Sequence, residues 1–453
     1  MPHVFQVLTG WFLLITQGFV ALARLIPHAL SALKADGGGL NERLAAEFTK
    51  PERQRDALAF LRAFWPTVHL SQNLIKAYEG SGTVILTRHA DVVEVLDRED
   101  DFETVYEPRM RVLTGGANFF LGMQDIPAYT RDLANMRLAV RREDLPGVVA
   151  PLFATRAAAI VAASNGRLDV PADMTLRLPA EMLADYFGLP GPDEAVVIGW
   201  ATDLFHYIFL DLTADPTVTE RAGKTAALLR AHVDALIAAR KASGVARDDV
   251  LGRCLALQKA GSPGMDDTGI RNNLMSLVTA AIPTLSKSSV QALDQLLSNP
   301  EGLAKAQAAA RSGDDATFAA CIWEALRLNP MNAVIYRRAA RDCTIAAHTL
   351  RARKVAKGTM VFAANLSAMF DPLRVPSPQA FRTDRTAGEY ILWGYGRHTC
   401  FGGYINEVAL PAMLKPLLAA PGLRRAAGAA GRINTGGTPF PQHFVVEFDT
   451  PAR

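Results

Sequence analysis

Apolar and polar residues recur with a helical period along most of this chain. From residue 127 to 257, apolar positions return every three or four residues with only brief interruptions. A longer run covers Asp267–Leu297 and a shorter one covers residues 316–328, and both stop at an Asn-Pro pair. Residues 84–87 are predicted to form a short strand, which precedes a helical pattern at 90–96. These patterns predict a mainly α fold with small β-sheets.

The N-terminal segment carries the most unusual pattern. No charged residue occurs between Val4 and Ala23, and twenty helical residues span roughly 30 Å, about the thickness of a bilayer core. The polar positions fall on one side of such a helix: Gln6, Thr9, Gly10, Thr16, Gln17 and Arg24. The basic residues of a secretory signal are missing before the apolar run. We therefore expect residues 4–26 to pack on their own domain or to lie on a membrane surface, with a membrane span as the less favoured alternative.

Length and composition limit the classes of protein. The chain has 453 residues, and 48 basic against 45 acidic side chains give a net charge of +3, which offers no general argument for nucleic acid. A hydrophobic share of 49% is typical of a globular protein. Because no linker separates smaller units, the predicted organisation is a hydrophobic helical segment at residues 1–34 and one large domain at 35–453. Four scattered cysteines exclude a disulfide scaffold and a multi-cysteine metal site, but not a single working thiolate.

One of these cysteines, Cys400, lies in a glycine-rich loop. Glycines stand at 394, 396, 402 and 403, and a helical pattern follows at residues 408–418. Such a loop can aim backbone N–H groups at the sulfur, and a following helix adds its dipole, so both would lower the thiol pKa. This environment suits a thiolate that binds a soft or redox metal. His398 and Arg397 could hold an anionic group of a cofactor, whereas the simpler alternative is a buried cysteine in a turn.

Upstream of this loop, Glu324 and Arg327 share one face of the helix at 316–328. Apolar neighbours surround the pair, which predicts that it is partly buried. Arg337, then Arg385, then the Cys400 loop follow in that order.

This order closely resembles the cytochrome P450 family over about residues 40–453. Glu324 and Arg327 match the ExxR pair of that family, and Arg385 matches the arginine that completes its structural triad. By the same resemblance Arg337 and His398 hold the propionates of the haem. The stretch from Trp393 through Gly396 to Gly402 matches the cysteine loop, with Trp393 in place of the usual phenylalanine, and Cys400 is the iron ligand. The resemblance implies the cytochrome P450 fold as a single large domain, and haem b (iron protoporphyrin IX) as cofactor.

The long helix departs from the family pattern. Its oxygen-activating motif corresponds to residues 280–284, where Thr284 keeps the alcohol and Pro283 replaces the acid. Proline in a helix interior lacks an N–H, so a kink is expected there. Thr284 is the candidate for proton delivery, with Thr279, Ser286 or water assisting. Some relatives without the acid use peroxide or rearrange a hydroperoxide, and this alternative stays open beside ordinary monooxygenation, which we favour.

Two other segments also depart from the family. Near residue 129 the family has a histidine and a propionate-binding arginine, whereas this chain has Tyr129 and offers only Arg131 or Arg137 as a replacement. Together with Arg141 and Arg142 they form a basic run, which is either a solvated face or a docking site for an acidic ferredoxin-like donor. After Cys400, Pro411 is expected to interrupt the next helix.

The sequence therefore predicts a haem-thiolate monooxygenase that inserts one oxygen atom from O2 into a small apolar organic substrate. Its expected partners are a ferredoxin and a ferredoxin reductase, with no nucleic acid, in a cytoplasmic protein that residues 4–26 could attach to a membrane surface. The first alternative is a peroxide-dependent or hydroperoxide-rearranging enzyme on the same fold. The second is a non-catalytic haem-binding accessory protein, which the intact Cys400 loop disfavours.

Overall fold

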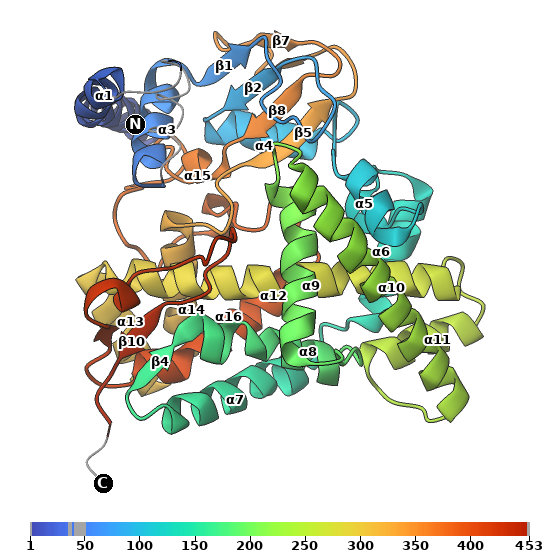
Figure 1. Ribbon diagram of the computed structural model, residues 1–453. Coiled ribbons are helices and arrows are strands. Elements are labelled where there is room, and N and C mark those ends of the chain that lie inside the picture. Colours follow the sequence, from blue (N-terminus) through green and yellow to red (C-terminus); the bar gives the residue numbers. More distant parts are fainter. Residues whose placement is uncertain (1, 35–38, 40–50, 451–453) are drawn as a thin grey trace. The chain divides into compact units, whose positions relative to one another are not determined.

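The computed structural model describes residues 2–34, 39 and 51–450 (Figure 1). These residues form two units whose segments alternate along the chain. The first unit takes residues 1–75, 79–103 and 332–399, and the second takes 76–78, 104–331 and 400–453. The chain therefore passes from the first unit to the second between Thr399 and Cys400.

The first unit is built on a five-stranded sheet in the order β1-β2-β8-β5-β3. The strands are β1 (Thr67–Leu70), β2 (Thr83–Leu86), β8 (Met360–Ala363), β5 (Ile335–Ala339) and β3 (Phe102–Glu103). Only the β2–β8 pair is parallel, with Val84 opposite Val361, and both side chains are fully buried. The helix α4 (His89–Asp97) packs Val92 and Val95 into the same core. The strand predicted at 84–87 and the helix at 90–96 are confirmed to within one residue.

Three further helices and a β-hairpin complete the described part of the first unit. They are α1 (Pro2–Lys34), α3 (Pro51–Phe64), α15 (Asn365–Ala368) and the hairpin of β6 (Cys343–Ile345) and β7 (Arg353–Val355). Helix α1 packs along α3, as Figure 1 shows. The two helices approach closely at Gly18, where an added Cβ atom would lie only 2.4 Å from the Cβ of Ala63. Residues 8–34 are thus part of a packed unit.

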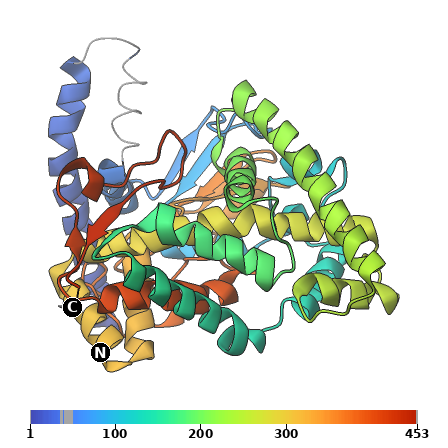
Figure 2. The same cartoon turned by 60° about the horizontal axis from the view of Figure 1, so that its bottom comes forward.

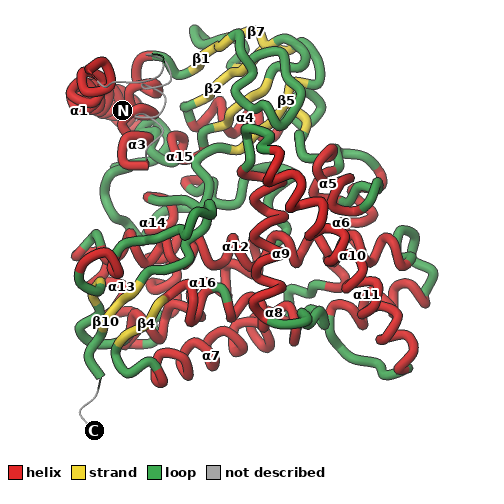
Figure 3. The backbone as a smooth tube through the Cα atoms, in the orientation of Figure 1, coloured by secondary structure: helices red, strands yellow, loops and turns green. Residues whose placement is uncertain are grey.

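The second unit is mainly helical, as Figure 3 shows by colour. Its helices are α5 (Glu107–Thr114), α6 (Pro127–Ala139), α7 (Ala150–Ala163), α8 (Arg177–Asp185), α9 (Glu194–Phe205), α10 (Pro216–Ser243), α11 (Val250–Lys259), α12 (Asp267–Leu297), α13 (Pro300–Ser312), α14 (Asp315–Leu328) and α16 (Gly403–Ala419). The long α12, yellow in Figures 1 and 2, contacts α8, α9, α10, α14 and α16. A small sheet holds β4 (Arg167–Asp169), β10 (Val445–Glu447) and β9 (Arg424–Arg425). The predicted fold class, mainly α with small sheets, is confirmed.

Local chemistry explains where the long helices begin. The Asp266 carboxylate accepts a 2.7 Å hydrogen bond from the N–H of Gly269 and caps α12. Asn299 caps α13 in the same way, and Pro300 occupies its first turn, where a missing N–H costs nothing. The helix predicted at Asp267–Leu297 is therefore confirmed at both ends.

Two prolines that should disturb helices lie inside unbroken ones. Helix α16 continues through Pro411, so the expected interruption there is wrong. Its buried side chains pack against α7 and α14, and this packing offsets the hydrogen bond that the proline removes. Helix α12 likewise continues through Pro283, which is buried.

Candidate functional site

Cys400 lies in the second unit, three residues before the first residue of α16. The backbone N–H groups of Gly402 and Gly403 lie close enough to its sulfur to lower the thiol pKa, while the Gly403 N–H donates to the Cys400 carbonyl at 3.1 Å. Burial raises the pKa of the Cys400 thiol and outweighs these two donors, so the net shift is opposite to the expected one. The side chain still reaches solvent. A cation bound to the sulfur would favour the thiolate at this position.

Aromatic side chains surround the Cys400 segment within the second unit. The ring of Phe401 packs on that of Phe120, in the short helix η1 (Phe120–Gly122), with centroids 5.2 Å apart. The Arg142 guanidinium lies 3.5 Å from the ring centre of Tyr404, in the first turn of α16. Through Arg142, the basic run thus contacts the segment that carries the cysteine.

Arg337 and His398 lie in the first unit and share a partner that the sequence did not reveal, Glu99. The Glu99 Oε1 atom is 2.9 Å from His398 Nδ1, and it accepts a 3.1 Å hydrogen bond from the His398 backbone N–H. Burial alone would raise the pKa of Glu99, but His398 and Arg337 outweigh it and hold that pKa below its usual value. Arg337 is buried on β5 and donates to the carbonyl of Tyr336 at 3.0 Å. These three residues form one electrostatic cluster.

The loop before the cysteine owes its glycines to backbone geometry. Gly394 and Gly396 have φ values of +82° and +72°, and a Cβ atom at Gly396 would lie 2.8 Å from the carbonyl oxygen of Leu96. Trp393, in the same loop, is half-buried. Gly396 is therefore required by the fold of the first unit, whatever else it contacts.

The hydroxyl groups of α12 stand in contrasting environments. Thr284 is half-buried, and its Oγ1 donates to the Ala280 carbonyl at 2.5 Å. Thr279 is 2% exposed, and its Oγ1 has no hydrogen-bond partner among the residues that the structure describes. Ser286 is held by Thr175, with the two hydroxyl oxygens 2.8 Å apart. Of these three hydroxyls, that of Thr279 is thus without a partner among the described residues, whereas those of Thr284 and Ser286 are already hydrogen-bonded.

Lys287 is the only ionisable residue within two turns of Thr284 on α12. Burial lowers the pKa of its ammonium group, and the Phe440 ring centre lies 5.9 Å from the Nζ atom. Within the described part of the chain, Lys287 has no hydrogen bond or ion pair. Phe440 also packs on Phe205 at the end of α9. A cation without a counter-charge therefore stands in an aromatic environment.

The two candidates on α6 differ in their surroundings. Tyr129 is buried, whereas Arg131 is exposed and pairs with Asp132, with Nε and Oδ1 2.7 Å apart. The structure does not bring Arg131 to the same side of α6 as Tyr129. Of these two, Tyr129 is the residue that faces the interior of the second unit.

Each charged group of the predicted structural triad has partners in its own unit. Glu324 and Arg327 form a two-pronged pair with both contacts at 2.8 Å, and both side chains are fully buried. Arg385 is also fully buried, and it donates to Glu389 and to the carbonyls of Pro376, Ser377 and Ala380. The Glu324–Arg327 pair, expected to be partly buried, is fully buried.

Known proteins resemble this chain in sequence and in fold. The family model described as "Cytochrome P450" matches residues 199–420, which include α12, α14 and the Cys400 loop. The chain belongs to the cytochrome P450 family. The solved structure of CalO2 superposes with a TM-score of 0.73 at 20% identity, covering 89% of this chain and 98% of CalO2, and it supports the same fold.

Two curated relatives show how far the likeness extends. Cyclomarin C epoxidase CymV from Salinispora arenicola is 26% identical over 284 residues, 62% of this chain and 67% of that protein. A linoleate diol synthase from Gaeumannomyces graminis is 38% identical over 89 residues, 20% of this chain and only 8% of that protein. The chain thus matches a small part of the second relative.

Haem is the cofactor that the P450 family implies, and the residues present fit such a group. In the second unit, Cys400 is exposed, and its sulfur lies near the backbone N–H groups of Gly402 and Gly403. In the first unit, Arg337 and His398 supply the cationic and hydrogen-bonding groups that suit carboxylates. No cluster of three His, Cys, Asp or Glu side chains that could hold a metal ion occurs in the described ranges.

Proposed function

We propose that this protein is a haem-thiolate monooxygenase that inserts one oxygen atom from O2 into an apolar organic substrate. Cys400 is the iron ligand, and the cofactor is haem b. The observation that carries the proposal is the position of Cys400 immediately before α16, with the backbone N–H groups of Gly402 and Gly403 near its sulfur. Bound iron supplies the cation that offsets the burial of this thiolate.

The cofactor's carboxylates are held by residues of the first unit. Arg337 and His398 bind the propionates, and Glu99 orients His398 through its contact at 2.9 Å. Trp393 and Gly396 shape the loop on which His398 stands. On α6, Tyr129 is the preferred cofactor contact, because Arg131 is already paired with Asp132.

Bound haem supplies oxygen activation, to which a cysteine ligand contributes electron density. The residues of this chain then control protons. Thr284 is the proton-delivering residue, and its hydroxyl must leave the Ala280 carbonyl in order to donate elsewhere. Thr279 provides a second hydroxyl one turn earlier, and water links the two in place of the acid that Pro283 replaces.

Electrons come from an acidic ferredoxin and its reductase in the cytoplasm. The exposed Arg137 and Arg142 support a docking face here, because Arg142 stacks on Tyr404, four residues after Cys400. The direct test is turnover of a ligand that shifts the haem spectrum. Product formed with NADPH, reductase and ferredoxin supports monooxygenation. The proposal is contradicted if hydrogen peroxide alone gives product while this electron-transfer system gives none.

A second candidate function is rearrangement of a fatty-acid hydroperoxide. Pro283 removes the acid that O2 activation ordinarily uses, and Lys287, half-buried without a counter-charge among the described residues, is suited to a carboxylate. A relative named linoleate diol synthase agrees with such a substrate class. This function is tested by adding a fatty-acid hydroperoxide without reductant. Rearranged product that disappears in Lys287→Gln but persists in Lys287→Arg supports it, and no reaction in the unaltered protein excludes it.

The accessory-protein alternative makes a third outcome. It would be supported if a bound ligand yielded no product with the electron-transfer proteins, with peroxide or with a hydroperoxide.

A further inference from the structure

Helix α1 exposes a continuous apolar face, which we call the outer face. Its members are Leu8, Phe12, Phe19, Ile26, Leu30 and Leu33, and each side chain is between 48% and 71% exposed. Their spacings of three, four and seven place them in one stripe, and 25 helical steps extend it over roughly 38 Å. No charged residue interrupts this stripe. A soluble monomer rarely exposes an apolar patch of this extent.

The opposite side of α1 is packed on its own unit. Gly10, Leu14, Gly18, Ala21 and Leu25 are buried, and they face α3 and the segment around residue 372. Figure 2 shows α1, in dark blue, as a long helix. By length and composition alone, Leu8–Leu33 could cross a membrane, as could Leu145–Ala163. The packing of α1 on α3 argues against a membrane span by α1, because insertion across a bilayer would carry charged residues of α3 into lipid.

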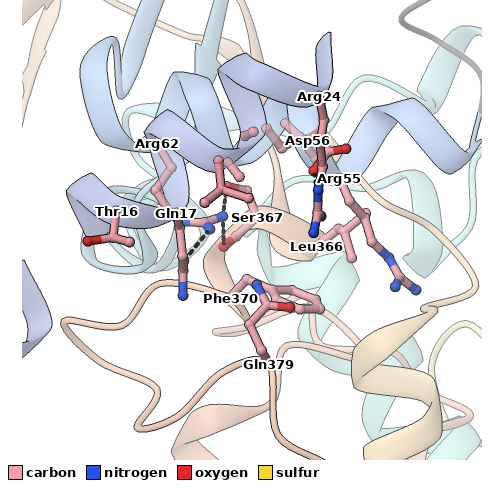
Figure 4. A pocket seen from close by; sticks show the side chains of 14 residues that line it. Thr16, Gln17, Arg24, Arg55, Asp56, Arg62, Leu366, Ser367, Phe370 and Gln379 are labelled. Atoms are coloured by element: carbon pink, nitrogen blue, oxygen red, sulfur yellow. Dashed lines mark hydrogen bonds and ion pairs between the residues drawn. The ribbon is translucent and has the colours of Figure 1, made fainter. Parts of the chain in front are cut away.

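A basic pocket of about 520 Å3 lies on the flank of α1, between α1, α3 and residues 366–379. Figure 4 shows Arg24, Arg55 and Arg62 around it, with Asp56 as the acidic residue among those lining it. Arg24 pairs with Asp56 at 3.5 Å, and Arg55 stacks on the ring of Phe370. Three positive charges against one negative charge make this pocket suitable for an anion.

Arg62 gives the pocket a buried cationic wall. Its side chain is 2% exposed and donates to Ser367 Oγ at 3.0 Å and to Gln17 Oε1 at 3.3 Å, while its Nε has no partner among the described residues. Burial lowers the pKa of Arg62 to about 10, with Asp371 opposing the shift and Arg88 adding to it. The guanidinium thus remains charged at neutral pH, and its charge is incompletely compensated.

We propose that α1 lies in the plane of a membrane surface rich in anionic phospholipid, with the outer face among the acyl chains and the basic pocket receiving a headgroup phosphate. The flank of a helix in this position lies at headgroup level, where Arg24 and the pocket open. A second copy of the chain fits less well. A symmetric dimer through the outer face would bring two identical basic flanks together.

The test uses the full-length haem protein and sedimentation with lipid vesicles. We expect binding to vesicles that mix phosphatidylglycerol with phosphatidylcholine, and weaker binding to phosphatidylcholine alone. The double variant Phe12→Glu with Phe19→Glu should lower the partition coefficient between vesicles and water by about tenfold or more. The reason is that two aromatic side chains would no longer be buried among the acyl chains. Arg24→Glu with Arg55→Glu should remove the preference for phosphatidylglycerol. Leu228→Glu, on α10 with 57% exposure, is the matched control and should bind as the unaltered protein does.

Circular dichroism and the haem spectrum show whether each variant is folded. The proposal is overturned if the outer-face variant binds vesicles as tightly as the Leu228 control. It is also overturned if the unaltered protein ignores vesicles but forms a dimer, seen by light scattering, that the outer-face variant converts to a monomer. Loss of vesicle binding with unchanged turnover would separate this surface from the proposed chemistry.

Discussion

Glu99 is the single residue whose role depends most on the structure. It stands in an acidic run and gives no spacing signal that connects it with residue 398. Glu99→Ala should weaken haem retention on the order of tenfold, because the 2.9 Å contact with His398 Nδ1 and the hydrogen bond from the His398 backbone N–H are both lost. Haem transfer to apomyoglobin measures this rate, and Glu99→Gln should give an intermediate value.

Asp100→Ala provides the control for Glu99, because its exposed side chain is the next in the chain. If Glu99→Ala and Asp100→Ala lose haem at the same rate, the orienting role of Glu99 is refuted. The reduced carbon monoxide spectrum should keep its position in both variants, since neither change reaches Cys400.

Thr284 is the residue at which the two candidate functions diverge. Thr284→Val removes the hydroxyl, so in the monooxygenase route product per NADPH should fall by about a hundredfold while hydrogen peroxide accumulates. Thr284→Ser should retain most coupling, and Thr279→Val should show a smaller loss of the same kind. Equal coupling in Thr284→Val and the unaltered enzyme would remove Thr284 from proton delivery.

The sequence identified most candidate residues because their order along the chain is distinctive. Glu324, Arg327 and Cys400 needed no coordinates. It missed Glu99 and Lys287, whose environments arise from long-range packing. It also anticipated the wrong net pKa shift at Cys400, because burial of the sulfur depends on tertiary structure.

At the scale of whole elements, the α1–α3 contact depends on Gly18. A methyl group there would meet Ala63 at 2.4 Å and the Phe64 ring at 2.7 Å. Gly18→Ala should therefore lower the free energy of unfolding by about 1–3 kcal/mol. Thermal or denaturant unfolding of the intact protein measures the change.

Gly199 on α9 is the matched control for Gly18. Nothing lies within 4 Å of a Cβ added there, so Gly199→Ala should raise the free energy of unfolding by about 0.5–1 kcal/mol through helix propensity. A Gly18→Ala protein as stable as Gly199→Ala would show that α1 is not closely packed on α3.

The elements themselves were largely predictable from the sequence. The helical periods located α12 and α14, and the Asn-Pro pairs marked where they stop. Proline rules failed at Pro411, because packing of α16 against α7 and α14 outweighs one lost hydrogen bond. The kink expected at Pro283 stays a prediction within a helix that continues through it.

As the proposed monooxygenase, the whole molecule would receive electrons from a partner protein. Arg142→Glu should slow reduction by an acidic ferredoxin on the order of tenfold at low salt, because it reverses a charge beside Tyr404. Stopped-flow reduction measures the rate, and rising salt should reduce the difference. Arg432→Glu, an exposed arginine elsewhere in the second unit, is the control. Equal rates for both variants at every salt concentration would place the docking face elsewhere.

The organisation of the chain into interleaved units was beyond sequence patterns. No linker marks the passage between Thr399 and Cys400, and segments more than 200 residues apart share the first unit. Periodicity reports local structure only, whereas the pairing of β2 with β8 is a long-range contact.

The central claim is that Cys400 is the thiolate ligand of a haem iron. The reduced carbon monoxide complex tests it most directly. The unaltered protein should absorb near the wavelength that gives the P450 family its name, and Cys400→Ser should lose that band while Cys254→Ser keeps it. Absence of the band in the unaltered protein, or its persistence in Cys400→Ser, would contradict the claim.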